Sequence, residues 1–245
     1  MGEPGEPRPQ GTATGDFNYK AFISYSWSDR RWGEWLHHAL ETYRAPKGIA
    51  GARTLHPIFK DREEEAAGAS IGAAIEAAMG QSEFLIVLCS PRSALSPWVN
   101  REVAWFKTHR DPHKILTLIV DGAPGASAIP GREAEECFPK TLLYKVAQDL
   151  QPTDQLEDAP LAADARESGD GKRAAKLKLA AAMLGVGLDT LINRDNRRRA
   201  ERRRLVTAGL ASLSVVLGGL SVFAFNQRDA AIASEIAGLN EQYRQ

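Results

Sequence analysis

The chain has 245 residues with 31 basic and 31 acidic side chains, so its formal net charge at pH 7 is zero. This balance hides an uneven distribution, since residues 194–204 hold seven Arg and residues 151–170 are acidic. Beside the uncharged run 205–225, the ordinary role of such Arg residues is to orient a membrane span and to attract anionic lipid, so no nucleic-acid partner is expected. Two cysteines, Cys89 and Cys137, and five scattered histidines match neither a zinc-binding spacing nor a disulfide framework, and they fit a reduced cytosolic domain.

Residues 1–17 are rich in Gly, Pro and charge and have too few apolar side chains to pack, so we expect a disordered leader. Residues 19–25 then form an apolar run that predicts a buried strand. The next apolar side chains, over residues 32–43, recur at the three-and-four spacing of one helix face. Ser28 or Asp29 is the expected N-cap of this helix.

A second strand is predicted over residues 55–59. The acidic, Gly-containing loop 60–70 separates it from a helix whose apolar side chains lie within residues 71–79. Residues 84–88 form a continuous apolar run, as in a strand covered on both faces of a sheet.

The next predicted helix begins at Ser96 and Pro97, since a serine hydroxyl can cap a helix and proline suits its first position. Residues 115–120 predict a fourth strand. Because strands and helices alternate along the chain, we expect an α/β fold with a doubly wound parallel sheet.

Residues 151–171 look like a polar linker, and residues 172–193 have the pattern of a further helix. That helix contains Gly185, Gly187 and Thr190, a partial match to a dinucleotide-binding fingerprint. The match is misleading, because the fingerprint requires a preceding strand and a helix precedes these residues.

The C-terminal part has the pattern of a membrane anchor. Residues 172–204 form a helical, Arg-rich juxtamembrane segment, and residues 205–225 run without a charge over a length that can cross a bilayer. Arg-rich flanks stay on the cytoplasmic side, so we expect a single-pass protein of the cell inner membrane, with residues 226–245 as a short extracytoplasmic tail. A buried core helix is the alternative for residues 205–225.

Ligands of doubly wound sheets bind outside the carboxyl ends of the strands. The side chains expected there are Ser24, Tyr25, Ser26 and Trp27 after the first strand, Asp61, Arg62 and Gly68 after the second, and Ser90, Trp98 and Glu102 after the third. Trp98 and Glu102 are four residues apart and so share one helix face. Spacing alone favours Trp98 as a packing residue and Glu102 as a solvated charge.

Five motifs, in this order, resemble those of a TIR domain: FISYS at 22–26, IFKDREEEAAG at 58–68, FLIVLCSP at 84–91, SPWVNRE at 96–102 and ILTLIVDG at 115–122. The resemblance implies a TIR domain over residues 18–150 with a flavodoxin-like, five-stranded parallel sheet. In the NAD+-cleaving members, a glutamate four residues after a tryptophan in this helix is catalytic, and Glu102 and Trp98 match that pair.

The resemblance also implies a nucleotide-binding role for the other residues at this edge. Asp61 to Gly68 corresponds to a loop that closes over the nucleotide and mediates assembly. Some NAD+-cleaving members have Arg where this chain has Ser26, and an aromatic residue where it has Ser70. Trp27 is an alternative stacking surface for the nucleotide.

The chemistry implied by the resemblance needs one carboxylate. Nicotinamide leaves as a neutral molecule from a cationic ring, so no proton donor is required, unlike in ordinary glycoside hydrolysis. Glu102 beside the ribose would stabilise the positive charge that grows there. Attack by water gives ADP-ribose, and attack by the adenine ring or another acceptor gives a cyclic or transferred product; the sequence does not choose between them.

We therefore expect a membrane-anchored NAD+ glycohydrolase, an effector of bacterial defence that is activated by oligomerisation. NAD+ is its substrate and no further cofactor or metal is expected. The expected partners are membrane lipid, an unidentified sensor or activator, and further copies of the chain that associate through the TIR domain and the span. The alternative is a TIR module that only assembles signalling partners without catalysis.

Overall fold

The computed structural model describes residues 17–46, 54–60, 69–158 and 161–193, together with Ser214 and Leu217. The chain divides into two units, Met1–Leu191 and Ile192–Gln245. All the helices and strands named below belong to the first unit.

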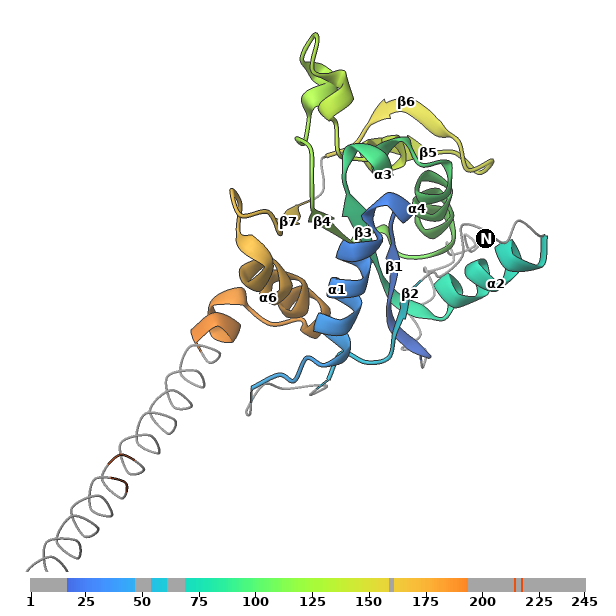
Figure 1. The fold of residues 1–245 in the computed structure, drawn as a ribbon. Helices are drawn as coiled ribbons and strands as arrows, with labels where there is room; N and C mark the ends of the chain where they lie inside the picture. The colour runs from blue at the N-terminus through green and yellow to red at the C-terminus, as the bar shows by residue number, and fades with distance from the viewer. Residues whose placement is uncertain are drawn as a thin grey trace, which may run out of the picture. The chain divides into compact units, whose positions relative to one another are not determined.

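The first unit is built on a sheet of five parallel strands in the order β2-β1-β3-β4-β7 (Figure 1). The strands are β1 (Tyr19–Ser24), β2 (Ile58–Lys60), β3 (Ser82–Cys89), β4 (Ile115–Ile119) and β7 (Ala162–Asp164). The strand order reverses between β1 and β3, as in doubly wound sheets. This confirms the predicted α/β fold with a five-stranded parallel sheet.

Helices cover both faces of this sheet. They are α1 (Arg30–Glu41), α2 (Ala69–Gly80), α4 (Pro97–His109) and α6 (Gly171–Leu184). α1 contacts α6, and α2 contacts α4, so the four helices form two pairs. The residue after α6, Gly185, adopts a left-handed conformation with φ of 64° and ends the helix, which explains the misleading glycine pattern there.

Short elements connect these layers. They are the 3₁₀ helices η1 (Trp27–Asp29), η2 (Pro112–Lys114), η3 (Ala126–Ala128) and η4 (Glu133–Glu135), the helices α3 (Pro91–Leu95) and α5 (Lys140–Leu143), and the antiparallel strands β5 (Tyr144–Val146) and β6 (Pro152–Leu156). α3 directly precedes α4, so the chain that leaves β3 forms two successive helices before it reaches β4.

One buried part of the core lies between the sheet and the pair α2 and α4. Phe22 and Leu85 from the sheet pack in one buried cluster with Val99, Val103 and Phe106 from α4. Glu102 is thus carried by a helix whose neighbouring side chains are buried and apolar, which fixes its place against β1.

Three sequence expectations need correction. The expected polar linker 151–171 contains β6 and β7, and β7 completes the sheet by pairing in parallel with β4. The second strand is Ile58–Lys60 rather than 55–59, since Pro57 has no N–H to donate to β1. Asp29 stands at the N-cap of α1, but its carboxylate makes no capping hydrogen bond and binds other residues instead.

Within the described part of the chain, no helix is long and apolar enough to cross a membrane. The predicted span 205–225 lies outside the described residues except for Ser214 and Leu217, as do residues 1–16 of the leader and the predicted tail 226–245.

Candidate functional site

A serine and a glutamate 78 residues apart in the sequence meet at the carboxyl end of β1. Ser24 is the last residue of β1, and its hydroxyl donates a hydrogen bond of 2.5 Å to Oε2 of Glu102 on α4. Glu102 is 4% exposed and Ser24 is fully buried, so this carboxylate is almost removed from water. A burial of this kind is costly for a charge unless it is compensated, and it is common at functional sites.

Local sequence fixes the start of the helix that carries Glu102. Ser96 caps α4 by accepting a hydrogen bond from the backbone N–H three residues later, and Pro97 occupies the first position. The Asn100 amide donates to the Ser96 carbonyl at 2.9 Å and accepts from the backbone N–H of Thr141 at 3.3 Å. The first turn of α4 is therefore tied both to α3 and to α5.

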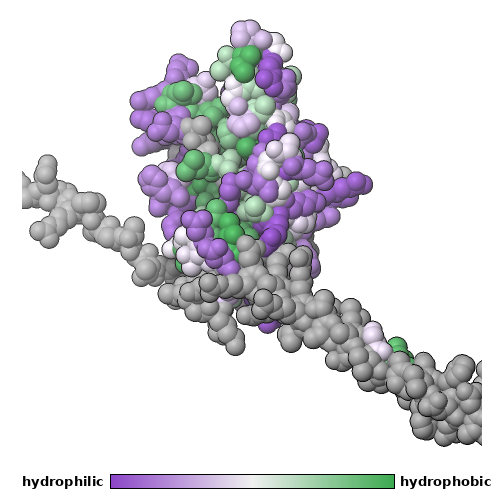
Figure 2. Space-filling model, turned by 90° about the vertical axis from the view of Figure 1, so that its left-hand side faces the viewer, coloured by the Kyte–Doolittle hydropathy of each residue, from purple (hydrophilic) through white to green (hydrophobic). Residues whose placement is uncertain are grey.

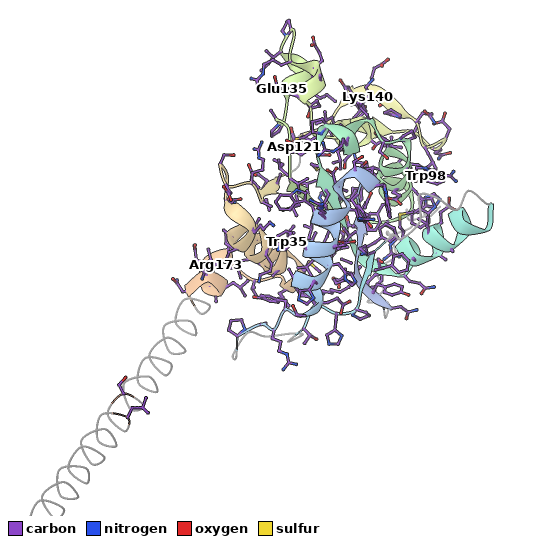
Figure 3. All side chains as sticks on the ribbon, viewed as in Figure 1. Trp35, Trp98, Asp121, Glu135, Lys140 and Arg173 are labelled. Carbon is purple, nitrogen blue, oxygen red and sulfur yellow. The ribbon has the colours of Figure 1, made fainter. Side chains whose placement is uncertain are left out.

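Trp98 and Glu102 have the opposite exposures to those that their spacing alone favours. Glu102 is buried, whereas Trp98 is 41% exposed, one turn earlier on α4. Figure 3 shows Trp98 on α4 and Trp35 on α1. The exposed indole of Trp98 is thus an aromatic surface one turn along α4 from the buried carboxylate. A flat ligand ring could stack on such a surface.

Tyr25 and Trp27 follow Ser24 and lie against α1. The ring of Tyr25 packs over Gly33, where a Cβ would lie 3.2 Å from three ring atoms, so a larger residue there would have to displace the ring slightly. Trp27 is 39% exposed, and the guanidinium of Arg30 lies 4.9 Å from its ring centroid. The Trp27 ring therefore already makes a cation–π contact with Arg30.

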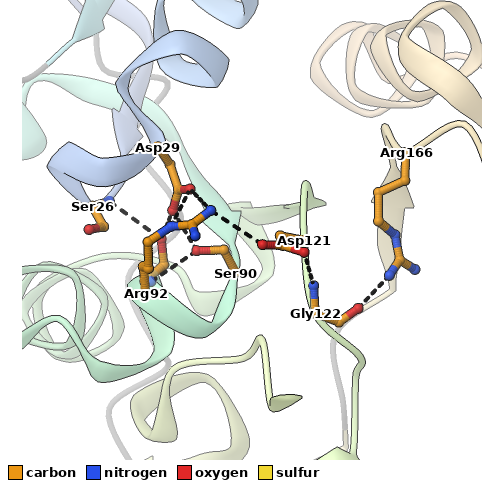
Figure 4. A network of polar contacts seen from close by, with 8 residues as sticks. Ser26, Asp29, Ser90, Arg92, Asp121, Gly122 and Arg166 are labelled. Atoms are coloured by element: carbon orange, nitrogen blue, oxygen red, sulfur yellow. Dashed lines mark hydrogen bonds and ion pairs between the residues drawn. The ribbon is translucent and has the colours of Figure 1, made fainter. Parts of the chain in front are cut away.

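Ser26 belongs to a buried polar network rather than to an open surface (Figure 4). Its backbone N–H donates to the Ser93 hydroxyl at 3.3 Å. The Ser93 hydroxyl and the Ser90 hydroxyl both donate to Oδ2 of Asp29, the former at 3.2 Å. Arg92 donates to Oδ1 of Asp29 from Nε at 3.2 Å and from Nη2 at 3.0 Å.

The network continues along the carboxyl edge of the sheet. Nη2 of Arg92 also lies 3.3 Å from Oδ2 of Asp121, and Oδ1 of Asp121 accepts from the backbone N–H of Gly122 at 2.9 Å. Arg166 donates to the Gly122 carbonyl and pairs with Asp164 at 2.6 Å. The hydrogen bonds from Arg166 are the main cause that holds the pKa of Asp164 below its usual value.

Two buried thiols lie near this edge. Burial is the main cause that raises the pKa of the Cys89 thiol well above its usual value, and burial followed by the charge of Glu136 raises that of Cys137 to about 12. Both thiols are therefore protonated at neutral pH and are poor nucleophiles. Among the described residues, no three His, Cys, Asp or Glu side chains gather as metal ligands do.

Two hollows in the surface of the described residues are lined by other residues than the site carboxylate. One of about 620 Å³ opens beside the start of α4 and is lined by Pro97, Asn100 and Arg101. Another of about 1110 Å³ lies between α6 and the strands β4 and β7. Figure 2 shows one face of the molecule, on which apolar side chains lie between polar ones. Neither is lined by Ser24 or Glu102.

The structure brings together part of the predicted site. Ser24 and Glu102 are in contact, Trp98 is one turn away, and the backbone N–H of Ser26 joins the Asp29 network. Asp61, Arg62 and Gly68 lie outside the described residues.

Sequence reasoning missed Asp29, Arg92 and Ser93 as members of the site. These residues follow β1 and β3, the two strands between which the strand order reverses. The rule that ligand sites form at this reversal was the signal that could have found them.

Comparison with known proteins agrees with this architecture. The family model of the TIR domain matches residues 21–157. The NAD(+) hydrolase ApTIR of an Actinoplanes strain is 28% identical over 235 residues, which cover 89% of this chain and 31% of that protein. The chain thus spans about a third of the length of that relative.

A solved structure of the activated Roq1 resistosome directly recognizing the pathogen effector XopQ contains TIR domains that align with 26% identity. The alignment covers 44% of this chain and 61% of that one, and its TM-score of 0.34 is too low to support an argument. The family match covers 137 of the 245 residues, more than half of the chain. With the five-stranded parallel sheet, it shows that the chain belongs to the TIR domain family.

Proposed function

We propose that this chain cleaves NAD+ at the bond between nicotinamide and ribose. The observation that carries the proposal is the buried Glu102 carboxylate, held by the Ser24 hydroxyl at the carboxyl edge of the sheet. The similarity to an NAD(+) hydrolase, ApTIR, over 89% of this chain supports the same reaction.

The chemistry fits a single desolvated carboxylate. As the bond to nicotinamide breaks, the pyridinium ring takes the bonding electrons and becomes neutral, while positive charge develops on the ribose. A negative charge close to that ribose stabilises the transition state more than the ground state, because the ground-state ribose is uncharged. Glu102 is 4% exposed, so water screens its charge little and this stabilisation is large.

Ser24 has the supporting role in this mechanism. Its hydroxyl donates to Oε2 of Glu102, which stabilises the buried negative charge and fixes the plane of the carboxylate. The ribose can then meet a carboxylate that needs no reorientation during the reaction. Trp98, one turn earlier and 41% exposed, offers an aromatic surface to a base of the dinucleotide.

The finer parts of the proposal rest on the sequence. The uncharged residues 205–225 after an Arg-rich segment support an inner-membrane anchor with the TIR domain in the cytoplasm. A role as a defence effector that oligomerisation activates is the proposed biological setting.

The test of the proposal is to incubate the purified full chain with NAD+ and to follow free nicotinamide together with the mass of the second product. Release of nicotinamide with ADP-ribose or its cyclic form would support it. If no nicotinamide appears even when the chain is concentrated or tethered, the chain is a module that assembles partners without catalysis, and the proposal is wrong.

A further inference from the structure

A second buried carboxylate lies on the segment that follows β1 and has no part in the mechanism above. Asp29 follows Ser24 by five residues, and its side chain is fully buried. Its carboxylate accepts hydrogen bonds from Ser90, Ser93 and Arg92. Each of these three donors lies between β3 and α4, on the segment that leads to Glu102.

The two carboxylates therefore link the same two stretches of chain. One stretch runs from Ser24 to Asp29, and the other runs from Ser90 to Glu102. The Ser24–Glu102 hydrogen bond is one link between the two stretches. The hydrogen bonds of Asp29 at the start of α3 are the other. Two links between two segments fix their separation and also their relative rotation, which a single link cannot do.

Continuous hydrogen bonds carry the position of α3 into α4. The backbone N–H of Ser96 donates to the Ser93 carbonyl at 3.1 Å, and the backbone N–H of Asn100 donates to the Ser96 carbonyl at 3.1 Å. The Asn100 amide adds a third bond, to the Ala94 carbonyl, at 3.0 Å. A shift of α3 therefore moves the first turns of α4, including Glu102.

Charge and geometry argue that Arg92 is a brace and not a receptor for a phosphate. Its guanidinium lies between two carboxylates, at 3.0 Å from Asp29 and 3.3 Å from Asp121, so the cluster of three has a net charge of −1. Such a cluster repels an anion. Arg92 is half exposed, however, so it can be replaced without opening a large cavity in the core.

We propose that Asp29 and Arg92 are positioning residues, which hold the end of β1 and the start of α4 at the separation that the Ser24–Glu102 contact requires. The proposal rests on the proposed function for its effect on turnover. The structural part of the proposal is that Asp29 fixes the position of α4. That part does not depend on the proposed function.

The chain offers a matched control. Glu136 is also a buried carboxylate that holds a loop together, with 8% exposure. It accepts from the backbone N–H groups of Phe138 and Ser127 at 2.9 and 3.1 Å and from the Ser127 hydroxyl at 2.8 Å. These partners lie between β4 and α5, and none of them is in the Ser24–Asp29 or Ser90–Glu102 stretch.

The experiment compares three variants of the full chain, Asp29→Asn, Arg92→Gln and Glu136→Gln, in NAD+ cleavage and in hydrogen exchange. We expect kcat to fall about tenfold or more in the first two variants, because small misplacements of a catalytic group cost this much. KM should stay within about threefold, since neither Asp29 nor Arg92 is proposed to contact NAD+. The Glu136→Gln variant should keep the kcat of the wild type per folded molecule.

Hydrogen exchange gives the readout that a merely structural role would not change. In Asp29→Asn we expect faster exchange in peptides covering residues 24–29 and also residues 97–102, with no change in peptides of α6. Faster exchange confined to residues 24–29 would overturn the proposal, and so would equal losses of kcat in the Asp29 and Glu136 variants. If Asp29→Asn does not fold, the same comparison is decided by Arg92→Gln.

The two proposals fail in different ways. If the wild type releases no nicotinamide, the proposed function is wrong, and the exchange pattern alone then decides whether Asp29 positions α4. If the wild type is active and the Asp29 and Arg92 variants keep its kcat, the positioning role is wrong while the proposed function stands.

Discussion

Replacement of Ser24 by alanine tests how the Glu102 carboxylate is held. The change removes one hydroxyl, which donates at 2.5 Å to a carboxylate of 4% exposure, and it leaves the volume of the site almost unchanged. A hydrogen bond to a charged group contributes about 1.5 to 3 kcal/mol, most of all where the partner stays buried. If that whole contribution is lost from the transition state, kcat falls by roughly 10- to 100-fold, since 1.4 kcal/mol is a factor of ten.

The Ser24→Ala variant should still fold, because a domain of this kind has a stability of about 5 to 15 kcal/mol. Ser82→Ala is the matched control, since Ser82 is also fully buried in a strand and its hydroxyl donates at 2.8 Å to the Ala78 carbonyl. We expect a smaller loss of unfolding free energy in urea for Ser82→Ala, about 0.5 to 1.5 kcal/mol, because its acceptor is a neutral carbonyl. Nicotinamide release at saturating NAD+ should fall only for Ser24→Ala. Equal turnover in wild type and Ser24→Ala, or an equal fall in Ser82→Ala, would refute the reasoning.

Three further predictions concern the acid stability, assembly and topology of the chain. Burial raises the pKa of Glu136, but hydrogen bonds from Phe138, Ser127 and Gly125 lower it more, so its stabilisation is present above the usual value of 4.5 and is lost as pH falls through the lowered one. The difference in urea stability between wild type and Glu136→Gln, about 1 to 3 kcal/mol at pH 7, should therefore shrink as pH falls from 4.5 through the lowered pKa. A difference that does not change with pH would contradict this. NAD+ cleavage should depend on clustering, so residues 1–191 should be nearly inactive in dilute solution and active when fused to an inducible oligomer. Activity per molecule that is equally high in both forms would contradict this. A reporter fused after Gln245 should behave as extracytoplasmic, given the Arg-rich segment before residue 205, and a cytoplasmic signal would reject the span or its orientation.

The fragment chosen for the clustering test shows what the sequence could not predict. A fragment that ends at residue 150, the predicted domain boundary, would lack β7, which pairs with β4 through Thr117 and Ala162. β7 has three residues, and of these only Ala163 is buried. So short an edge strand leaves no apolar run, because its place in the sheet depends on backbone pairing and not on side-chain burial.

The predictions that hold are those with a strong local cause. The central strands β1 and β3 bury most of their side chains, so continuous apolar runs reveal them. Ser96 and Pro97 define the start of α4 through a capping bond and a fixed φ, both of which depend only on neighbouring residues. The chain's local pattern thus determines where Glu102 stands on its helix.

The Asp29 network, in contrast, depends on contacts between residues that are far apart in the sequence. A Ser or Asp before a helix suggests a cap, and Asp29 satisfies that pattern. Its actual partners lie 61 to 64 residues later and include the half-exposed Arg92. Only the packing of α3 against η1 brings these groups together, and no spacing rule within one element encodes that contact.

The rate of nicotinamide release by Glu102→Gln, measured beside wild type and Glu136→Gln, tests the proposed chemistry most simply. The change keeps the side-chain volume and removes the charge. A unit charge about 4 Å from the developing charge contributes roughly 4 kcal/mol at an effective dielectric constant near 20. We therefore expect kcat to fall about 1000-fold in Glu102→Gln and to stay near the wild-type value in Glu136→Gln. Cleavage by a folded Glu102→Gln variant within about threefold of wild type would contradict the assignment of this carboxylate.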